Sequence, residues 1–227
     1  MANTLYIGNR NYSSWSLRPW LVLKWGGIPF VEREIRLDQP GYGVGAIAEV
    51  LAVSPNGRVP CLHAGELVIW DSLAIAEWAA EERPDAGLWP RDRAQRALAR
   101  AVVAEMHSGF ADVRRELTMN IRRRCAPQDW QPATRAQLAR LDQIWSGLRE
   151  ANKTAGPWLF GERGIADAFY APVATRMRTY GVALAKSSQE WCETVFADAA
   201  FQQWETASQP DSWDQPGYPV IDKLYSR

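Results

Sequence analysis

Two adjacent hydroxyl side chains, Ser13 and Ser14, stand where the chain changes from a short apolar run to a helical pattern. In open α/β sheets, ligands bind beyond the carboxyl ends of strands, near the N-termini of the following helices. A serine at such a position can also cap the helix by accepting a hydrogen bond from its backbone. One serine can cap while its neighbour faces a ligand, so both are candidates for chemistry.

A proline at the start of a predicted strand marks a second candidate group, Asn56-Gly57-Arg58-Val59-Pro60. Proline is tolerated in a strand mainly at its first residues or on an edge. Most X-Pro bonds are trans, but a cis Val59-Pro60 bond would turn the preceding backbone outward. Val59 could then pair its N–H and C=O with an extended peptide, as an added strand does.

A third group, Asp71-Ser72, lies where a predicted strand runs directly into a helix. Either residue could be a plain N-cap. A helix N-terminus with free N–H groups and a hydroxyl can also hold a carboxylate, while a neighbouring aspartate holds an ammonium. Together the two residues could recognise the head group of an α-amino acid.

The elements that must position these groups alternate between strands and helices in the first 83 residues. Apolar alternation and helical periodicity predict the order β-α-β-α-β-β-α. The predicted ranges are 4–8, 15–25, 30–37, 44–53, 59–63, 67–70 and 72–82. A βαβ unit followed by a hairpin and a helix makes a small mixed sheet with helices on its faces.

After residue 90 the pattern is helical. The sequence predicts one long helix or a kinked pair over 91–124, helices over 130–153 and 165–184, and shorter helices around 189–208. Residues 84–90 contain two prolines and a glycine, which stop a helix. We therefore predict an α/β domain at 1–83, a linker at 84–90 and an all-helical domain at 91–227, with an irregular tail from about residue 209.

Composition excludes several function classes. Lys plus Arg and Asp plus Glu both total 26, so there is no basic excess for nucleic acid or an anionic membrane. The run Arg122-Arg123-Arg124 is local, and it fits a solvated helix end or an anion contact. The N-terminus lacks the apolar core of a signal peptide, and no apolar stretch approaches the length of a membrane span. Three dispersed cysteines and two histidines predict a cytoplasmic protein without a disulfide framework or a metal site.

The three groups, in this order on this pattern of elements, resemble the cytosolic glutathione transferases over nearly the whole chain to about residue 208. The run Ser13-Ser14-Trp15-Ser16-Leu17-Arg18 looks most like the zeta class, which has Ser-Ser-Cys-Ser-x-Arg. The resemblance implies a thioredoxin-like N-terminal domain, an all-α C-terminal domain, a homodimer and glutathione as co-substrate.

The resemblance also implies residue roles. Ser13, or Ser14 if the match shifts by one residue, would donate a hydrogen bond to the glutathione sulfur. Val59 beside a cis Pro60 would pair with the cysteinyl backbone, Arg58 could reach the glycyl end, and Asp71 and Ser72 would hold the γ-glutamyl end. The electrophile pocket would lie between the domains, lined by Tyr12, Trp15, Met106, His107, Phe110 and Arg114. These six residues could equally be core.

Two departures bear on the activity. Trp15 stands where the zeta class has a cysteine, which argues against zeta-type isomerase chemistry, and the absence of any cysteine in this loop disfavours glutaredoxin-type chemistry. Gly164 replaces the usual Ser or Thr before Ile165-Ala166-Asp167, so Asp167 is expected to be structural. We expect a glutathione transferase acting on hydrophobic electrophiles. The alternatives are a glutathione-dependent isomerase, an ether-cleaving lyase, or a non-catalytic scaffold of the same fold.

Overall fold

A four-stranded mixed sheet forms the core of the N-terminal half. The computed structural model describes residues 2–126 and 128–208, so the predicted tail from about 209 lies outside the described residues. The strands are β1 (Asn3–Ile7), β2 (Phe30–Glu34), β3 (Cys61–Ala64) and β4 (Leu67–Trp70), in the spatial order β2-β1-β3-β4. β1 pairs in parallel with β2 and antiparallel with β3, and β3 and β4 form a hairpin.

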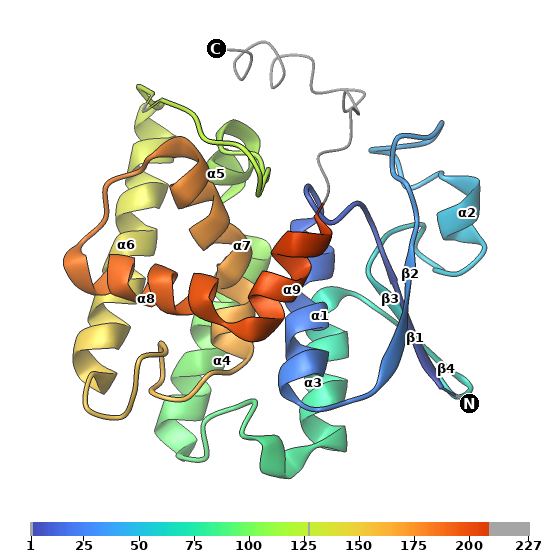
Figure 1. Cartoon of the computed structure of the whole chain (residues 1–227), viewed down its shortest axis with the longest axis horizontal. Helices are drawn as coiled ribbons and strands as arrows, with labels where there is room; N and C mark the ends of the chain where they lie inside the picture. The colour runs from blue at the N-terminus through green and yellow to red at the C-terminus, as the bar shows by residue number, and fades with distance from the viewer. Residues whose placement is uncertain (1, 127, 209–227) are drawn as a thin grey trace.

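Helices cover both faces of this sheet (Figure 1). α1 (Ser14–Trp25) and α3 (Ser72–Glu82) pack together on one face, and α2 (Ala48–Leu51) lies on the other. A small apolar cluster around Ile35, Ile47 and Val50 fills the space beneath α2. The expected thioredoxin-like βαβαββα order is confirmed.

α2 is shorter than the helix predicted over residues 44–53. Gly41, Gly43 and Gly45 all have positive φ angles, so the chain turns before the helix begins. The turn also brings Gly45 against Gly57, where a Cβ would lie 2.0 Å from the Gly45 carbonyl oxygen. Only glycine fits such a close backbone approach.

The C-terminal half is helical in its described residues. A short 3₁₀ turn at Pro84–Ala86 leads to α4 (Arg93–Ser108) and α5 (Ala111–Glu116). The region predicted as one long helix or a kinked pair is broken at Gly109-Phe110, where Phe110 has φ 59°, and the helical pattern ends at Glu116. α6 (Pro132–Asn152), α7 (Ile165–Tyr180), α8 (Lys186–Ala197) and α9 (Ala199–Ala207) follow.

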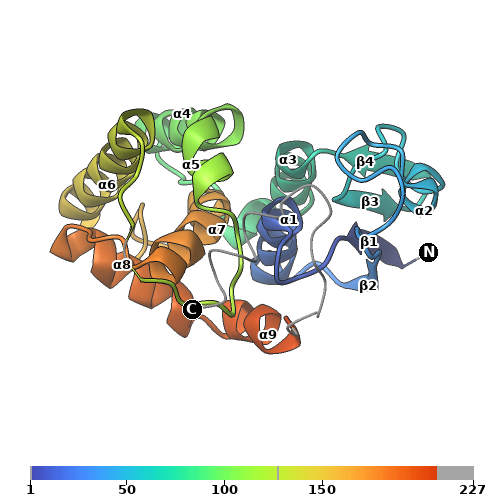
Figure 2. The ribbon, with the colours of Figure 1, turned by 90° about the horizontal axis from the view of Figure 1, so that it is seen from above.

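α1 joins the two halves of the molecule. Ten of its twelve residues are buried, because α3 covers one side while α7 and α9 cover the other (Figure 2). A helix that is enclosed all round needs apolar residues all round, and Leu17, Trp20 and Leu21 provide them. One continuous apolar core therefore runs from the sheet through α1 into the helical half.

The surroundings of the N-terminus of α7 explain why Gly164 stands where Ser or Thr was expected. A Cβ at Gly164 would lie 2.7 Å from the Leu88 carbonyl oxygen, so the linker approaches too closely for Ser or Thr. Asp167 is buried and accepts hydrogen bonds from Gly164 N (2.9 Å), Leu159 N (3.0 Å) and Trp191 Nε1 (2.8 Å). Burial raises the pKa of Asp167 to about 6, against the effect of these donors. Asp167 thus ties α7 to its neighbours.

A membrane-spanning helix must be both long and apolar. Within residues 2–126 and 128–208, no helix meets both requirements.

Candidate functional site

Ser13 is the N-cap of α1, at the end of the loop that follows β1. Its Oγ lies 3.4 Å from Ser16 N, a long capping bond, and 2.8 Å from Ser16 Oγ. Ser16 Oγ in turn accepts a hydrogen bond from Gly8 N at 3.1 Å, and Ser13 N donates to Asn9 O at 2.9 Å. The Ser13 hydroxyl is therefore held by a second serine that is itself anchored to the end of the first strand.

Ser14 points elsewhere. It is the first residue of α1, and its Oγ lies 3.5 Å from a guanidinium nitrogen of Arg176 on α7. Both atoms are buried where the two halves of the molecule meet. The two serines thus have different surroundings: Ser13 belongs to the cap of α1, and Ser14 belongs to the contact between α1 and α7.

The Val59-Pro60 peptide bond is cis. The strand β3 starts at Cys61, immediately after the proline, rather than at residue 59. Pro60 is buried, Val59 is half-buried against the cluster beneath α2, and Arg58 is exposed. The Arg58 backbone N donates to Asn56 Oδ1 at 3.0 Å, which fixes the turn that precedes Val59.

Asp71 and Ser72 form the N-terminus of α3. Asp71 is the N-cap, with Oδ1 accepting from Leu73 N at 2.7 Å, and its φ of 78° is unusual for a residue other than glycine. Such strained conformations concentrate at functional sites. The Ser72 Oγ is buried and has no hydrogen-bond partner among the described residues. A capping aspartate and an unsatisfied hydroxyl therefore stand side by side at a helix N-terminus.

His107 on α4 connects this helix terminus to the helical half. Its Nε2 lies 3.3 Å from Asp71 Oδ2, and its ring meets the Trp15 indole edge-on with centroids 5.3 Å apart. Burial lowers the pKa of His107, and the neighbouring Asp71 opposes that shift while Arg18 and Arg114 add to it. The net effect favours the neutral imidazole at the boundary between the two halves.

A cluster of three arginines, Arg18, Arg114 and Arg176, lies near Trp15. The Arg18 guanidinium is fully buried, and none of its three nitrogens has a hydrogen-bond partner in the described part of the chain. Burial lowers the pKa of Arg18 well below its ordinary value, and the charges of Arg114 and Arg176 lower it further. Burial similarly lowers the pKa of Arg176 to about 9. Three like charges at a buried place favour an anion there.

Trp15 supports this cluster directly. The Arg18 guanidinium carbon lies 4.3 Å from the Trp15 ring centroid, and that of Arg114 lies 4.7 Å from it. Arg114 also donates to the carbonyls of Gly109 (3.0 Å) and Met106 (2.5 Å), while Arg176 donates to Leu117 O (2.7 Å) and Pro172 O (3.1 Å). Arg114 and Arg176 are thereby fixed, and Arg18 is left without such bonds.

Sequence reasoning named Arg114 but did not assign a role to Arg18 or Arg176. Arg18 could have been found, because it stands four residues after Ser14 and hence on the same face of the helix. Arg176 had no local signal, since its position depends on how α7 crosses α1. Of the other expected pocket residues, Tyr12 and Trp15 are half-buried, whereas Met106 and Phe110 are buried in the core.

A separate cavity of about 370 Å³ lies away from these groups. The linker, the start of α4 and the segment before α7 line it, including Leu88, Gln95 and Glu162. Asp167 lines it, but Ser13, Ser14, Asp71, Ser72 and the clustered arginines do not. We therefore place the candidate site around α1 and not in this cavity.

Comparison with known proteins identifies the family of the chain. The N-terminal domain of glutathione S-transferases matches residues 12–82, and their C-terminal domain matches residues 131–220. A maleylacetoacetate isomerase of Pseudomonas aeruginosa is 30% identical over 92% of this chain and 98% of its own length. A maleylacetoacetate isomerase of Rattus norvegicus is 29% identical over 92% and 94%.

A solved glutathione transferase homolog from Burkholderia gl BGR1, with bound glutathione, is 25% identical. Its TM-score is 0.66 over 92% of this chain and 98% of that one. Fold and sequence together define a two-domain protein with a thioredoxin-like domain followed by a helical one. The chain belongs to the glutathione S-transferase family, and zeta-class maleylacetoacetate isomerases are among its relatives.

Proposed function

We propose that this protein is a glutathione-dependent isomerase that acts on a small unsaturated carboxylic acid. The observation that carries the proposal is the buried Arg18 guanidinium, which lacks a partner in the described residues and lies in a cluster with Arg114 and Arg176. The names of the two isomerase relatives support the same reaction. This function departs from the hydrophobic electrophile that we expected from the sequence.

Glutathione would lie along the carboxyl end of the sheet. Val59, beside the cis bond, would pair with the cysteinyl backbone, and Arg58 would reach the glycyl carboxylate. The free N–H groups of α3 and the unpaired Ser72 hydroxyl suit the γ-glutamyl carboxylate, while Asp71 suits its ammonium group. The Ser72 hydroxyl has no partner among the described residues. One Asp71 oxygen caps α3 and the other lies near His107, but each carboxylate oxygen can accept a further hydrogen bond.

The thiol would be activated by Ser13. In the structure the Ser13 hydroxyl donates to Ser16 Oγ at 2.8 Å, and Ser16 Oγ also accepts from Gly8 N. Rotation of the two hydroxyls would reverse the serine–serine bond, so that Ser16 donates to Ser13 Oγ and the Ser13 proton turns to the glutathione sulfur. A free thiol has a pKa of about 8.5. A hydrogen bond to a charged group contributes roughly 1.5–3 kcal/mol, which lowers the thiol pKa by about 1–2 units if it favours the thiolate alone. No histidine base is needed.

The proposed reaction adds and then removes the thiolate. The sulfur forms a bond to one carbon of a conjugated cis double bond, and the π electrons move to the conjugated carbonyl oxygen as an enolate. Rotation occurs about the carbon–carbon bond, which is now single. The enolate electrons then re-form the double bond in the trans geometry, the carbon–sulfur bond breaks, and the thiolate leaves unchanged. No oxidant, metal or net proton transfer is required.

The arginine cluster would hold a carboxylate of the acid. Arg18 would supply hydrogen bonds that it does not make within the described residues, and the two fixed arginines would add favourable charge. Fork-shaped guanidinium groups bind carboxylates in this way. The cluster adjoins Ser14 through Arg176, so a substrate carboxylate there would place the double bond towards the serine loop.

Trp15 does not prevent this chemistry. The attacking sulfur is supplied by glutathione, so the missing cysteine at position 15 removes no reacting group. The indole instead contacts the guanidinium groups of both Arg18 and Arg114. Cation–π contacts of this kind stabilise desolvated cations by about 1–2 kcal/mol.

Conjugation of glutathione to a hydrophobic electrophile is the second candidate. The half-buried aromatic side chains of Tyr12 and Trp15 favour it, because they offer apolar surface beside the same serine loop. Both reactions begin with the same thiolate, so the second substrate must distinguish them.

The experiment compares two substrates in the wild-type protein and in two variants. Maleylacetoacetate tests isomerisation and chlorodinitrobenzene tests conjugation, each with glutathione. Arg18→Met should lower kcat/KM for the acid by roughly 10- to 100-fold, the loss expected for one charged hydrogen-bonded contact. It should leave conjugation within about twofold. Arg100→Met is the matched control, because Arg100 also stacks on a tryptophan, Trp89, but lies outside the cluster.

A thermal melt excludes unfolding as the cause. Removing a buried charge that has no ion-pair partner among the described residues should raise stability by roughly 1–3 kcal/mol, so Arg18→Met should melt no lower than the wild type. Binding of glutathione with conjugation but no isomerisation would replace this proposal by the second candidate. No binding of glutathione in titration calorimetry would favour the non-catalytic scaffold.

A further inference from the structure

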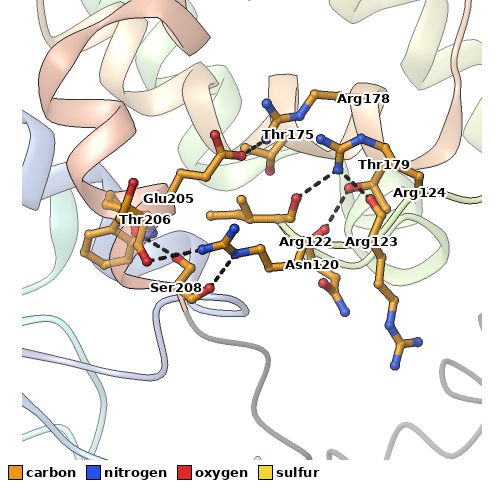
Figure 3. Close-up of polar contacts among 12 residues, drawn as sticks. Asn120, Arg122, Arg123, Arg124, Thr175, Arg178, Thr179, Glu205, Thr206 and Ser208 are labelled. Carbon is orange, nitrogen blue, oxygen red and sulfur yellow. Dashed lines mark hydrogen bonds and ion pairs between the residues drawn. The ribbon is translucent and has the colours of Figure 1, made fainter.

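The loop between α5 and α6 carries the run Arg122-Arg123-Arg124 and contacts distant parts of the molecule. It is fixed to α7, because Thr179 Oγ1 donates to Asn120 O at 2.8 Å and Cys125 N donates to Thr179 O at 2.6 Å. Figure 3 shows Arg122 reaching from this loop towards the end of α9, while Arg124 turns back on the loop itself. The three arginines therefore differ in their contacts, although they are adjacent in sequence.

Arg122 binds the C-terminal end of α9. Its Nε donates to Ser208 O at 2.6 Å, and its Nη2 donates to Thr206 O at 3.2 Å (Figure 3). The last carbonyls of a helix carry the negative end of its dipole and lack partners within the helix. One guanidinium thus satisfies two carbonyls and fixes where α9 ends.

The backbone of the same residue contacts the serine loop. Arg122 N donates to Asn11 Oδ1 at 3.2 Å, and Ile121 N donates to Asn11 O at 3.3 Å. Asn11 and Ile121 are buried, so water does not replace these bonds readily. The side chain and the backbone of Arg122 therefore link α9 to the loop that precedes α1.

α9 makes its own contact with that loop. Trp204 Nε1 donates to Arg10 O at 3.1 Å, and the Trp204 indole is fully buried with its ring 5.2 Å from that of Trp20. Arg10 and Asn11 form the tip of a turn in which Asn9 O accepts from both Tyr12 N and Ser13 N. Both tip residues, three and two positions before Ser13, are held by the helical half.

We propose that Arg122 is a positioning residue for Ser13. It locks the end of α9 and the arginine loop onto the turn at residues 9–13, and so holds the Ser13 hydroxyl in place. The proposal rests on the proposed thiol activation by Ser13 for its consequence, but the anchoring itself can be measured without glutathione. It also gives the run Arg122-Arg123-Arg124 a structural contact at Arg122 in place of the expected solvated helix end.

The test compares Arg122→Ala with Arg124→Ala in the full chain. Arg124 Nη1 donates to carbonyls of its own loop, Ile121 O (3.0 Å) and Arg123 O (2.7 Å), so its loss removes the same charge without releasing α9. Hydrogen exchange followed by mass spectrometry on peptides spanning residues 8–16 is the first readout. Exchange there should be faster by roughly 3- to 10-fold in Arg122→Ala and unchanged in Arg124→Ala. Arg122→Lys, which keeps one donor, should restore part of the protection.

The second readout is the pKa of the thiol of bound glutathione, from its ultraviolet titration. Arg122→Ala should raise it and lower kcat, with KM for glutathione changing less than twofold, because the γ-glutamyl and cysteinyl contacts lie on other segments. Equal exchange at residues 8–16 in Arg122→Ala and Arg124→Ala would overturn the proposal, whatever the activity. Faster exchange with an unchanged thiol pKa would also overturn it, since α9 would then not position Ser13. If wild-type protein binds no glutathione, the proposed function fails while the exchange data still decide the anchoring.

Discussion

The clearest separation of the two candidate serines comes from replacing each by alanine. Ser13 and Ser14 are adjacent, but the Ser13 hydroxyl is hydrogen-bonded to a second hydroxyl, Ser16 Oγ, whereas Ser14 faces Arg176. We expect Ser13→Ala to remove the hydrogen bond to the glutathione thiolate and Ser14→Ala to leave it in place. Ser13→Thr keeps the hydroxyl and serves as the conservative variant.

The size of the effect follows from that single hydrogen bond. A charged hydrogen bond contributes roughly 1.5–3 kcal/mol, or about 1–2 units of thiol pKa. At a pH below both pKa values, the thiolate fraction of the bound glutathione should fall by about 10- to 100-fold in Ser13→Ala. The structural cost should be small, because the capping distance to Ser16 N is already a long 3.4 Å and Gly8 continues to hold Ser16.

Ultraviolet absorbance of the bound thiolate, titrated against pH, measures this pKa directly. Titration calorimetry above the thiol pKa should give glutathione affinities for the three variants within a few-fold of the wild type. A raised thiol pKa in Ser14→Ala with none in Ser13→Ala would move the role to Ser14. An unchanged thiol pKa in both would refute activation by either hydroxyl.

Three further predictions concern stability. His107→Gln should reduce the loss of stability on acidification. Burial lowers the folded-state pKa of His107 below its value in the unfolded chain, so protonation below about pH 6.5 favours unfolding of the wild type. Thermal melts from pH 7.5 to 5.5 measure this loss. A wild-type-like slope would show that His107 is not the group responsible. Asp167→Asn should lower the free energy of unfolding in urea by roughly 2–4 kcal/mol. The amide nitrogen cannot accept a hydrogen bond, so it would leave one of the backbone N–H groups that donate to the wild-type carboxylate without an acceptor. A loss below about 1 kcal/mol would contradict this. Gly164→Ser should lower stability by about 1–3 kcal/mol, although serine is the family's usual cap, because its Cβ would meet Leu88 O; a stabilised variant would refute the close approach.

The sequence was most informative where the physics is local. Hydrophobic periodicity placed α1, α3 and α6 within about two residues, and the hairpin of β3 and β4 followed from its short turn. The predicted helix over residues 44–53 shrank to four residues, because glycines with positive φ turn the chain there. The break at Gly109-Phe110 depends on a left-handed phenylalanine, which no propensity would suggest.

The parts of the candidate site that lie in continuous segments were predictable from the sequence, and the parts that several helices bring together were not. The serines, the proline bond and Asp71-Ser72 lie in short continuous segments, so their order along the chain is enough to propose them as candidates. The arginine cluster comes from three helices, α1, α5 and α7. It depends on the point along α1 at which α7 packs against it. Contacts such as Arg122 to Asn11 span 111 positions and leave no trace in a single sequence.

The enclosure of α1 has a consequence for attempts to divide the protein. If residues 1–83 were expressed alone, Leu17, Trp20 and Leu21 would become more exposed to solvent. The fragment would present an apolar surface where α7 and α9 pack in the whole protein. Such a fragment should aggregate or recruit a substitute helix. Any engineering that exchanges catalytic loops between relatives should therefore transplant the α1, α7 and α9 contact as one block.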